Sequence, residues 1–124
     1  MPVSGLRDQT TEAILGCAFE VSNALGHGFL EAVYRRALAR EFAYRNIPFS
    51  EETSFPVTYR GSVVGHYVAD LVVADRVIVE LKAVDGLVPA HYAQILNYLN
   101  ASQLSIGLLI NFGRPRIEYK RIIR

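Results

Sequence analysis

Three charged side chains interrupt two otherwise apolar segments near the middle of the chain. Asp70 lies in the first of these segments, and Glu80 and Lys82 lie in the second. If residues 74–76 form a three-residue hairpin loop, the register places Asp70 directly opposite Glu80. Glu80 and Lys82 are two residues apart, so both side chains point to the same face of the hairpin.

Two carboxylates that face each other across a strand pair repel, and a divalent cation would remove that repulsion. Oxygen ligands suit Mg²⁺ or Mn²⁺, which can act as a Lewis acid on a phosphoryl oxygen. Lys82 could position an attacking water or stabilise charge on a phosphate. The alternative is a solvated sheet face on which Lys82 simply pairs with Glu80, and the spacing alone leaves both interpretations open.

Two further pairs of polar residues lie on faces that the pattern expects to be apolar. Gln94 and Tyr98 are four residues apart and share one helix face, where they could also form an ordinary amphipathic border. Glu31 and Tyr34 lie one turn apart after the glycine-rich break at residues 26–28. An acid in a first helical turn interacts favourably with the helix dipole, so a capping role for Glu31 is the simpler alternative.

The apolar periodicity predicts the elements that must hold these residues. We expect helices over residues 8–25, 30–45 and 89–101, and strands over 55–59, 66–73, 77–81, 106–111 and, as a plausible edge strand, 117–123. The resulting order, ααβββαβ(β), is typical of a mixed α/β or α+β fold.

The first helix should bury one stripe of apolar side chains. Ile14, Ala18, Val21 and Leu25 recur at helical spacing, and Cys17 lies within that segment. We therefore expect Cys17 to be a buried structural residue, and a single cysteine excludes an intrachain disulfide.

Length and composition restrict the class of protein further. The 124 residues, 51% of them hydrophobic, predict a single domain over residues 1–124 with a real core. A formal net charge of +1 excludes a histone-like polycation. No segment is apolar for long enough to span a bilayer, and the start does not have the layout of a signal peptide, so we expect a cytoplasmic protein without a membrane partner.

Basic residues concentrate at the end of the chain. The last twelve residues hold five basic side chains and one acidic side chain. This excess predicts a local nucleic-acid-binding surface, to which we assign Arg114, Arg116, Lys120 and Arg121.

Together these positions resemble a known family. Residues 28–34, Gly-Phe-Leu-Glu-Ala-Val-Tyr, resemble the GxxExxY signature of small bacterial and archaeal proteins within the PD-(D/E)XK nuclease superfamily. Asp70 followed by Glu80-Leu81-Lys82 is similar to the D…ExK core of that superfamily, although Ala69 stands where the proline is usual. Residues 94–98 resemble the QxxxY element of its RecB-like branch.

The resemblance covers almost the whole chain and implies both a fold and a site. The implied fold is restriction-endonuclease-like, with a central mixed sheet flanked by helices. The implied metal ligands for Mg²⁺ or Mn²⁺ are Glu31, Asp70 and Glu80. Lys82 corresponds to the catalytic lysine, and Gln94 and Tyr98 form the neighbouring helix face of the active site.

Three functions are consistent with the sequence. The favoured one is a metal-dependent nuclease (a hydrolase) that cleaves phosphodiester bonds, acting on DNA more than on RNA. The second is a weak or inactive module of the same fold that binds nucleic acid or a protein partner, and the near-neutral charge favours it somewhat. The third is a purely structural domain, and a homodimer is left open.

Overall fold

The computed structural model describes residues 8–124. Its elements, in chain order, are α1 (Gln9–Leu25), α2 (Glu31–Tyr44), β1 (Phe49–Tyr59), β2 (Ser62–Val73), β3 (Val77–Lys82), α3 (Pro89–Ser102), β4 (Ile106–Asn111) and β5 (Glu118–Ile123). This order confirms the predicted ααβββαβ(β) arrangement, including the last strand. Pro89 is at the start of α3, where its missing N–H costs nothing.

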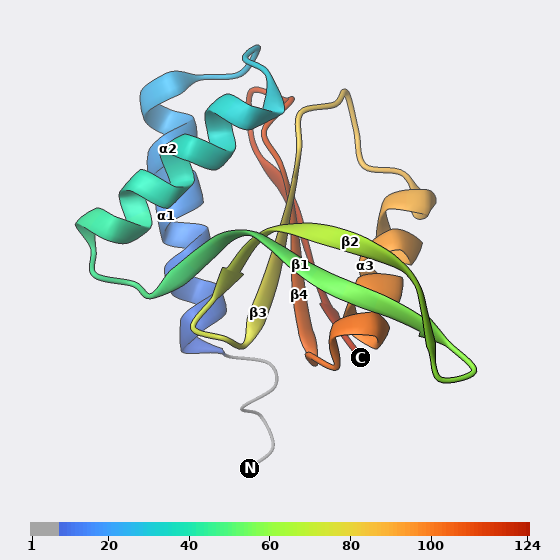
Figure 1. Cartoon of the computed structure of the whole chain (residues 1–124). Coiled ribbons are helices and arrows are strands. Elements are labelled where there is room, and N and C mark those ends of the chain that lie inside the picture. The colour runs from blue at the N-terminus through green and yellow to red at the C-terminus, as the bar shows by residue number, and fades with distance from the viewer. Residues whose placement is uncertain (1–7) are drawn as a thin grey trace.

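A single five-stranded mixed sheet forms the centre of the fold. The strands lie in the order β1-β2-β3-β4-β5, with β3 and β4 parallel and the other neighbours antiparallel. A parallel pair needs a long crossover, and α3 provides it between β3 and β4. Helices α1 and α2 cover one face of the sheet and α3 covers the other, which confirms the predicted mixed α/β class (Figure 1).

The larger apolar core lies between the sheet and helices α1 and α2. Ile14, Cys17 and Val21 are buried there, as the periodicity predicts. Burial raises the pKa of the Cys17 thiol, which suits a structural residue. Leu25 was expected to belong to the same stripe but is exposed, because it lies in the last turn of α1, beyond the cover of the sheet.

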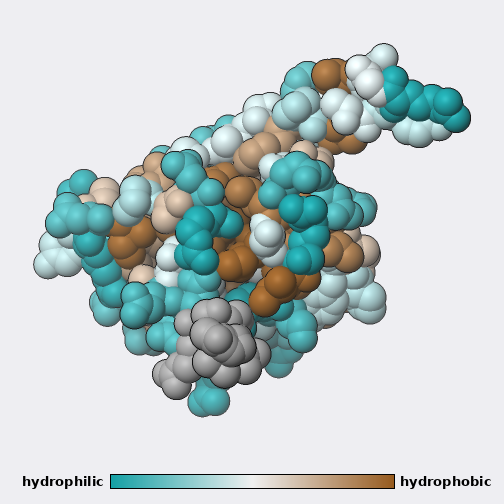
Figure 2. All heavy atoms as spheres, turned by 90° about the horizontal axis from the view of Figure 1, so that it is seen from below, coloured by the Kyte–Doolittle hydropathy of each residue, from teal (hydrophilic) through white to brown (hydrophobic). Residues whose placement is uncertain are grey.

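The hairpin of β1 and β2 is longer than the sequence predicts. Strand β1 begins at Phe49 rather than residue 55, and β2 begins at Ser62 rather than residue 66. We call its outer part, residues 54–68, the β-arm; it projects from the body of the molecule (Figures 1 and 2). Val63 and Val64 are both exposed although they are apolar, so buried and exposed residues do not alternate regularly in this part of the hairpin. The apolar periodicity therefore could not predict where the two strands begin.

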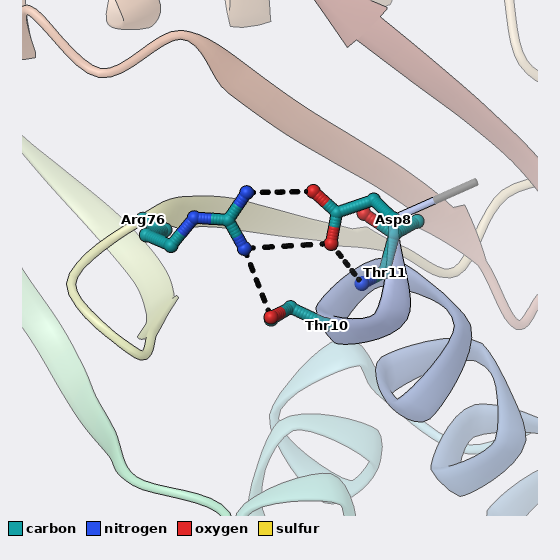
Figure 3. A network of polar contacts seen from close by, with 4 residues as sticks. All are labelled: Asp8, Thr10, Thr11 and Arg76. Carbon is teal, nitrogen blue, oxygen red and sulfur yellow. Dashed lines mark hydrogen bonds and ion pairs between the residues drawn. The ribbon is translucent and has the colours of Figure 1, made fainter. Parts of the chain in front are cut away.

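The start of α1 is tied to the turn between β2 and β3 (Figure 3). The Asp8 carboxylate accepts a hydrogen bond from the Thr11 N–H at 3.1 Å, which caps the helix, and forms an ion pair with Arg76 at 2.8 Å. Arg76 also donates to the Thr10 hydroxyl at 2.9 Å. These bonds keep the pKa of Asp8 below its usual value and fix the helix to the sheet.

Among the helices of the described part of the chain, none is long and apolar enough to cross a membrane.

Candidate active site

Asp70 and Glu80 lie side by side on neighbouring strands, and each carboxylate accepts a hydrogen bond from the backbone of the opposite strand. The predicted register is present, with Val73 paired to Val77, but backbone pairing stops at Leu71 and Val79, one position short of the two acids. Beyond that point Glu80 Oε2 accepts from the Asp70 N–H at 3.1 Å, and Asp70 Oδ2 accepts from the Leu81 N–H at 2.7 Å. The two carboxylates thus replace the backbone pair that the sequence predicts.

Both carboxyl groups are partly or wholly removed from solvent. Glu80 is buried, and burial, followed by the Asp70 charge, raises its pKa to about 8. Burial also raises the pKa of Asp70, although the hydrogen bond from Leu81 and the Lys82 charge act in the opposite direction. The site therefore disfavours two bare negative charges, as expected of a place that a cation would occupy.

The strand is irregular at Asp70. Ala69 packs in the cluster under α3, whereas Leu71, two residues later, packs in the core under α1 and α2. A regular strand would point both side chains to one face, so β2 changes face at Asp70. On β1, Glu52 lies opposite Asp70, between the residues that pair with Leu71 and Ala69, and has a positive φ of 47°. Its carboxylate forms an ion pair with Arg35 of α2 at 3.2 Å. This irregularity frees the Asp70 N–H for the Glu80 side chain.

Lys82 ends β3 and points toward α3. Its Nζ donates to Gln94 Oε1 at 3.4 Å, which brings together two of the predicted site residues from different elements. Within the described residues Lys82 forms no ion pair, so the simple Lys82–Glu80 pair that the sequence left open is absent. The ammonium is held beside the two carboxylates and still acts on the pKa of both.

Glu31 reaches the site from the first turn of α2. The pKa of Glu31 is raised first by partial desolvation and then by the Asp70 charge, and it is lowered by the Lys82 charge. The three side chains therefore interact electrostatically. No hydrogen bond joins Glu31 to another described residue, and Leu30, the residue before the helix, provides no side-chain cap. Glu31 thus lies within electrostatic range of Asp70 and Lys82, and its place in the first turn of α2 also suits the helix dipole.

Tyr34 fixes the loop that precedes Glu31. Its buried hydroxyl donates to the Gly26 carbonyl at 2.7 Å and accepts from the Phe29 N–H at 3.3 Å. Its ring stacks on Phe112 with centroids 4.7 Å apart. Gly28 has a φ of 114°, a conformation that other residues rarely adopt. The glycine and the tyrosine of this segment are thus structural, and they position the acid between them.

Tyr98 lies one helical turn beyond Gln94 and packs against β2. Its ring stacks on Tyr67 with centroids 4.0 Å apart, and the Tyr67 hydroxyl donates to the Tyr98 carbonyl at 2.9 Å. Desolvation raises the pKa of Tyr67 to about 12 and that of Tyr98 in the same direction, so both remain neutral phenols. Tyr98 joins α3 to the sheet beside the acids.

A cluster of hydrogen bonds around Asn111, which we call the clamp, lies behind Lys82 and was not predicted from the sequence. Asn111, fully buried, accepts from the Val84 and Gly113 N–H groups and donates to the Val84 carbonyl and to Glu118, each at 3.0 Å. Glu118 also accepts from the Leu87 N–H at 3.1 Å. The clamp fixes the loop that follows Lys82. The sequence feature that could have indicated the clamp is Asn111 itself, an amide at the end of the otherwise apolar strand β4.

The four predicted nucleic-acid-binding residues do not form one patch. Arg114 and Arg116 are exposed in the loop between β4 and β5, and Arg114 donates to the Asp85 carbonyl at 3.5 Å, next to the segment that follows Lys82. Lys120, on β5, pairs with Leu109 of β4. Arg121 lies on the α1 side of the sheet, where it lines a hollow with Asp8 and Glu12. Of the four residues, Arg114 and Arg116 are therefore the ones that lie at the same end of the sheet as Lys82.

The acids provide a partial set of metal ligands. Within residues 8–124, no three acidic, histidine or cysteine side chains are close enough to form a ready-made metal centre. However, Asp70 Oδ1 and Glu80 Oε1 form no hydrogen bond with any described residue. Mg²⁺ commonly takes one or two carboxylates and completes its shell with water and substrate oxygens, so a site of this composition fits it.

Two solved structures share this fold. One is the crystal structure of SSO0001, with 18% identity and a TM-score of 0.60 over 98% of this chain and 59% of the other. The second is an alkaline exonuclease from Laribacter hongkongensis, with 14% identity and a TM-score of 0.54 over 98% of this chain and 74% of the other. This chain thus spans less than two thirds of the first structure. The chain therefore shares its fold with a solved exonuclease structure.

The family follows from the sequence match. A model of the PD-(D/E)XK nuclease superfamily matches residues 8–122, so the chain belongs to that superfamily. No curated protein matches the chain. The matched segment contains all the acids of the site together with Lys82 and Gln94.

Proposed function

We propose that this protein is a divalent-metal-dependent nuclease that hydrolyses phosphodiester bonds, with DNA preferred over RNA. The observation that carries the proposal is the pair of neighbouring carboxylates, Asp70 and Glu80, each of which binds the backbone of the opposite strand beside the Lys82–Gln94 contact. Membership of the nuclease superfamily supports the reaction class. The preference for DNA rests on the family resemblance and is the part most easily tested separately.

Each residue has a distinct role in the proposed reaction. Asp70 and Glu80, with Glu31 as a third carboxylate, would hold Mg²⁺ or Mn²⁺, which supplies Lewis-acid polarisation of the phosphoryl oxygen when bound. Lys82 orients the attacking water and stabilises charge on the phosphate. Gln94 holds the Lys82 ammonium through the 3.4 Å contact and is a positioning residue.

Hydrogen bonds behind the site hold the loops next to Glu31 and Lys82 in place. Tyr34 fixes the loop before Glu31, and the Asn111–Glu118 clamp fixes the loop after Lys82. Both act on backbone, so neither needs to contact the substrate. Arg114 and Arg116 would neutralise phosphates of the substrate, and the hydrogen bond from Arg114 to the Asp85 carbonyl, close to the segment after Lys82, supports this role.

A cleavage assay tests the proposal. Single-stranded and duplex DNA and RNA are incubated with the wild-type protein in Mg²⁺, Mn²⁺ or chelator, beside Asp70→Asn, Lys82→Ala and the control Arg40→Ala, an exposed residue of α2. We expect metal-dependent cleavage by wild type and Arg40→Ala and none by the two site variants. Equal cleavage by Asp70→Asn would contradict the proposal.

The binding module remains the second candidate, because residues 8–124 hold no preformed three-ligand metal centre. In that case the wild-type protein binds nucleic acid equally well in Mn²⁺ and in chelator and cleaves none. A nuclease instead shows metal-dependent product from the same substrate.

A further inference from the structure

A cleft lies between the β-arm and the C-terminal half of α3. Its volume is about 560 Å³, within the range of about 300–1,000 Å³ typical of small-molecule sites. Residues 56–58 of β1 form one wall, and Tyr67, Asn97 and Tyr98 form part of the others. None of the described residues that line it is charged, so the cleft suits a neutral planar group rather than a phosphate.

The walls of the cleft combine aromatic rings with free amides. Tyr67 and Tyr98 stack in nearly parallel planes, 5° apart, and Phe55 stacks on Tyr67 with centroids 5.3 Å apart. The side-chain amides of Asn97 and Asn100 are exposed and form no hydrogen bond with any described residue. An amide carries both donors and acceptors, the groups needed to bind the edge of a nucleobase.

The cleft lies beside the proposed active site, on the face of the sheet that α3 covers. Tyr98 lies one turn from Gln94, which binds Lys82, and Glu80 acts on the pKa of both tyrosines. Glu80 and Lys82 share the sheet face of Ile78, which α3 covers. The β-arm itself contains no acidic residue and has Arg60 at its tip, a charge compatible with a passing phosphate backbone.

We propose that this cleft binds an unpaired nucleobase of the strand whose phosphate lies at Asp70, Glu80 and Lys82. The inference rests on the proposed nuclease function and makes single-stranded nucleic acid, or an unpaired end, the preferred substrate class. The stacked tyrosines are held in place before binding, because the Tyr67 hydroxyl bonds the Tyr98 carbonyl, so little ordering is needed. A base within a duplex is already paired and stacked and cannot enter.

Binding in chelator, where no cleavage occurs, tests the cleft. The probes are short fluorescein-labelled DNA strands, either intact or with one abasic site moved along the strand, and the matched duplex. Wild type should bind the intact single strand, and an abasic site at one register should weaken binding about tenfold. Equal binding of all abasic strands would overturn the proposal.

Two variants localise the effect. Thr58→Trp fills the cleft from β1, and its control, Ser54→Trp, adds the same ring at an exposed β-arm residue outside the cleft. Thr58→Trp should lose about tenfold in single-strand affinity and all abasic sensitivity, with duplex binding unchanged. Should the tryptophan impair folding, the double variant Asn97→Ala/Asn100→Ala should lose affinity without a change in melting temperature, against the exposed control Asn23→Ala.

The outcomes separate this proposal from the nuclease proposal. If Thr58→Trp and the double variant bind and cleave as wild type does, the cleft proposal is wrong and the nuclease stands. If wild type cleaves nothing but shows the abasic and Thr58→Trp effects, the base-binding cleft stands and the nuclease proposal is wrong. If wild type binds no single strand, the cleft proposal is wrong.

Discussion

Asp70 and Glu80 each accept a hydrogen bond from the backbone of the opposite strand, at 2.7 and 3.1 Å, at the place where the strands stop pairing. The arrangement uses one oxygen of each carboxylate for structure and leaves the other oxygen of each for a ligand. It also holds two acids against each other in a buried place, where the pKa of Glu80 rises to about 8. Stability and metal binding are therefore coupled at these residues.

The first prediction concerns pH. The pKa of Glu80 is about 8 in the folded state, against 4.5 for a free glutamate. Between these two pH values the folded state binds more protons than the unfolded state, so the free energy of unfolding falls as pH rises from about 5 to about 8. Asp70 and Glu31 shift in the same direction. The lowered pKa values of Asp8 and Glu118 act only below this window.

Urea unfolding in chelator at about pH 5 and about pH 8 measures this change, which we expect to be a few kcal/mol. Glu80→Gln should be much less pH-dependent. A wild-type stability that rises across the window would contradict the burial of a protonated Glu80.

The second prediction separates the roles of Lys82 and Gln94. Lys82→Ala should retain the rise in melting temperature that Mn²⁺ causes, because lysine is not a ligand, and should lose at least about 100-fold in cleavage rate. Gln94→Ala should lose about tenfold, since the lysine is then present but less well held. Loss of the Mn²⁺ response in Lys82→Ala would show that the lysine is needed to build the site.

The third prediction concerns the clamp behind Lys82. Asn111→Ala removes four hydrogen bonds and leaves partly buried backbone groups without these partners, so we expect a loss of about 2 kcal/mol in the free energy of unfolding and a fall in cleavage rate. The matched control is Asn23→Ala on the exposed face of α1. Equal unfolding curves for the two variants would mean that the loop does not depend on Asn111.

The fourth prediction concerns the loop before Glu31. Tyr34→Phe removes two hydrogen bonds from a buried ring and should lower the free energy of unfolding by about 1–2 kcal/mol. Cleavage should weaken because Glu31 is no longer held at its place. Tyr44→Phe, at an exposed tyrosine, is the control and should change neither quantity.

The fifth prediction concerns the basic residues. The double variant Arg114→Ala/Arg116→Ala should bind single-stranded DNA with a salt dependence flatter by about 1.4 in log–log slope, about 0.7 for each lost contact. Arg121→Ala should keep the wild-type slope, because Arg121 lies on the α1 side of the sheet. A slope that changes only in Arg121→Ala would place the substrate on the opposite face.

The sequence predicted the order of the elements and the approach of Asp70 to Glu80, because a three-residue loop and an alternating pattern determine a local hairpin register. It could not show that the carboxylates replace the backbone pair, since that depends on the change of face at Asp70 and on Glu52 of β1. Nor could it show the Asn111–Glu118 clamp, which joins loops distant in sequence. The contacts that the sequence missed are therefore mostly non-local.

The central claim is that Asp70 and Glu80 hold a divalent cation, and the melting temperature with and without Mn²⁺ tests it most directly. A cation bound only by the folded state stabilises it by mass action, so wild type should melt higher in Mn²⁺ than in chelator, whereas Asp70→Asn and Glu80→Gln should lose most of that rise. In chelator both amide variants should melt at least as high as wild type, since each keeps an oxygen for the backbone N–H and removes a charge. An unchanged Mn²⁺ response in both variants, together with lower melting temperatures in chelator, would contradict the claim.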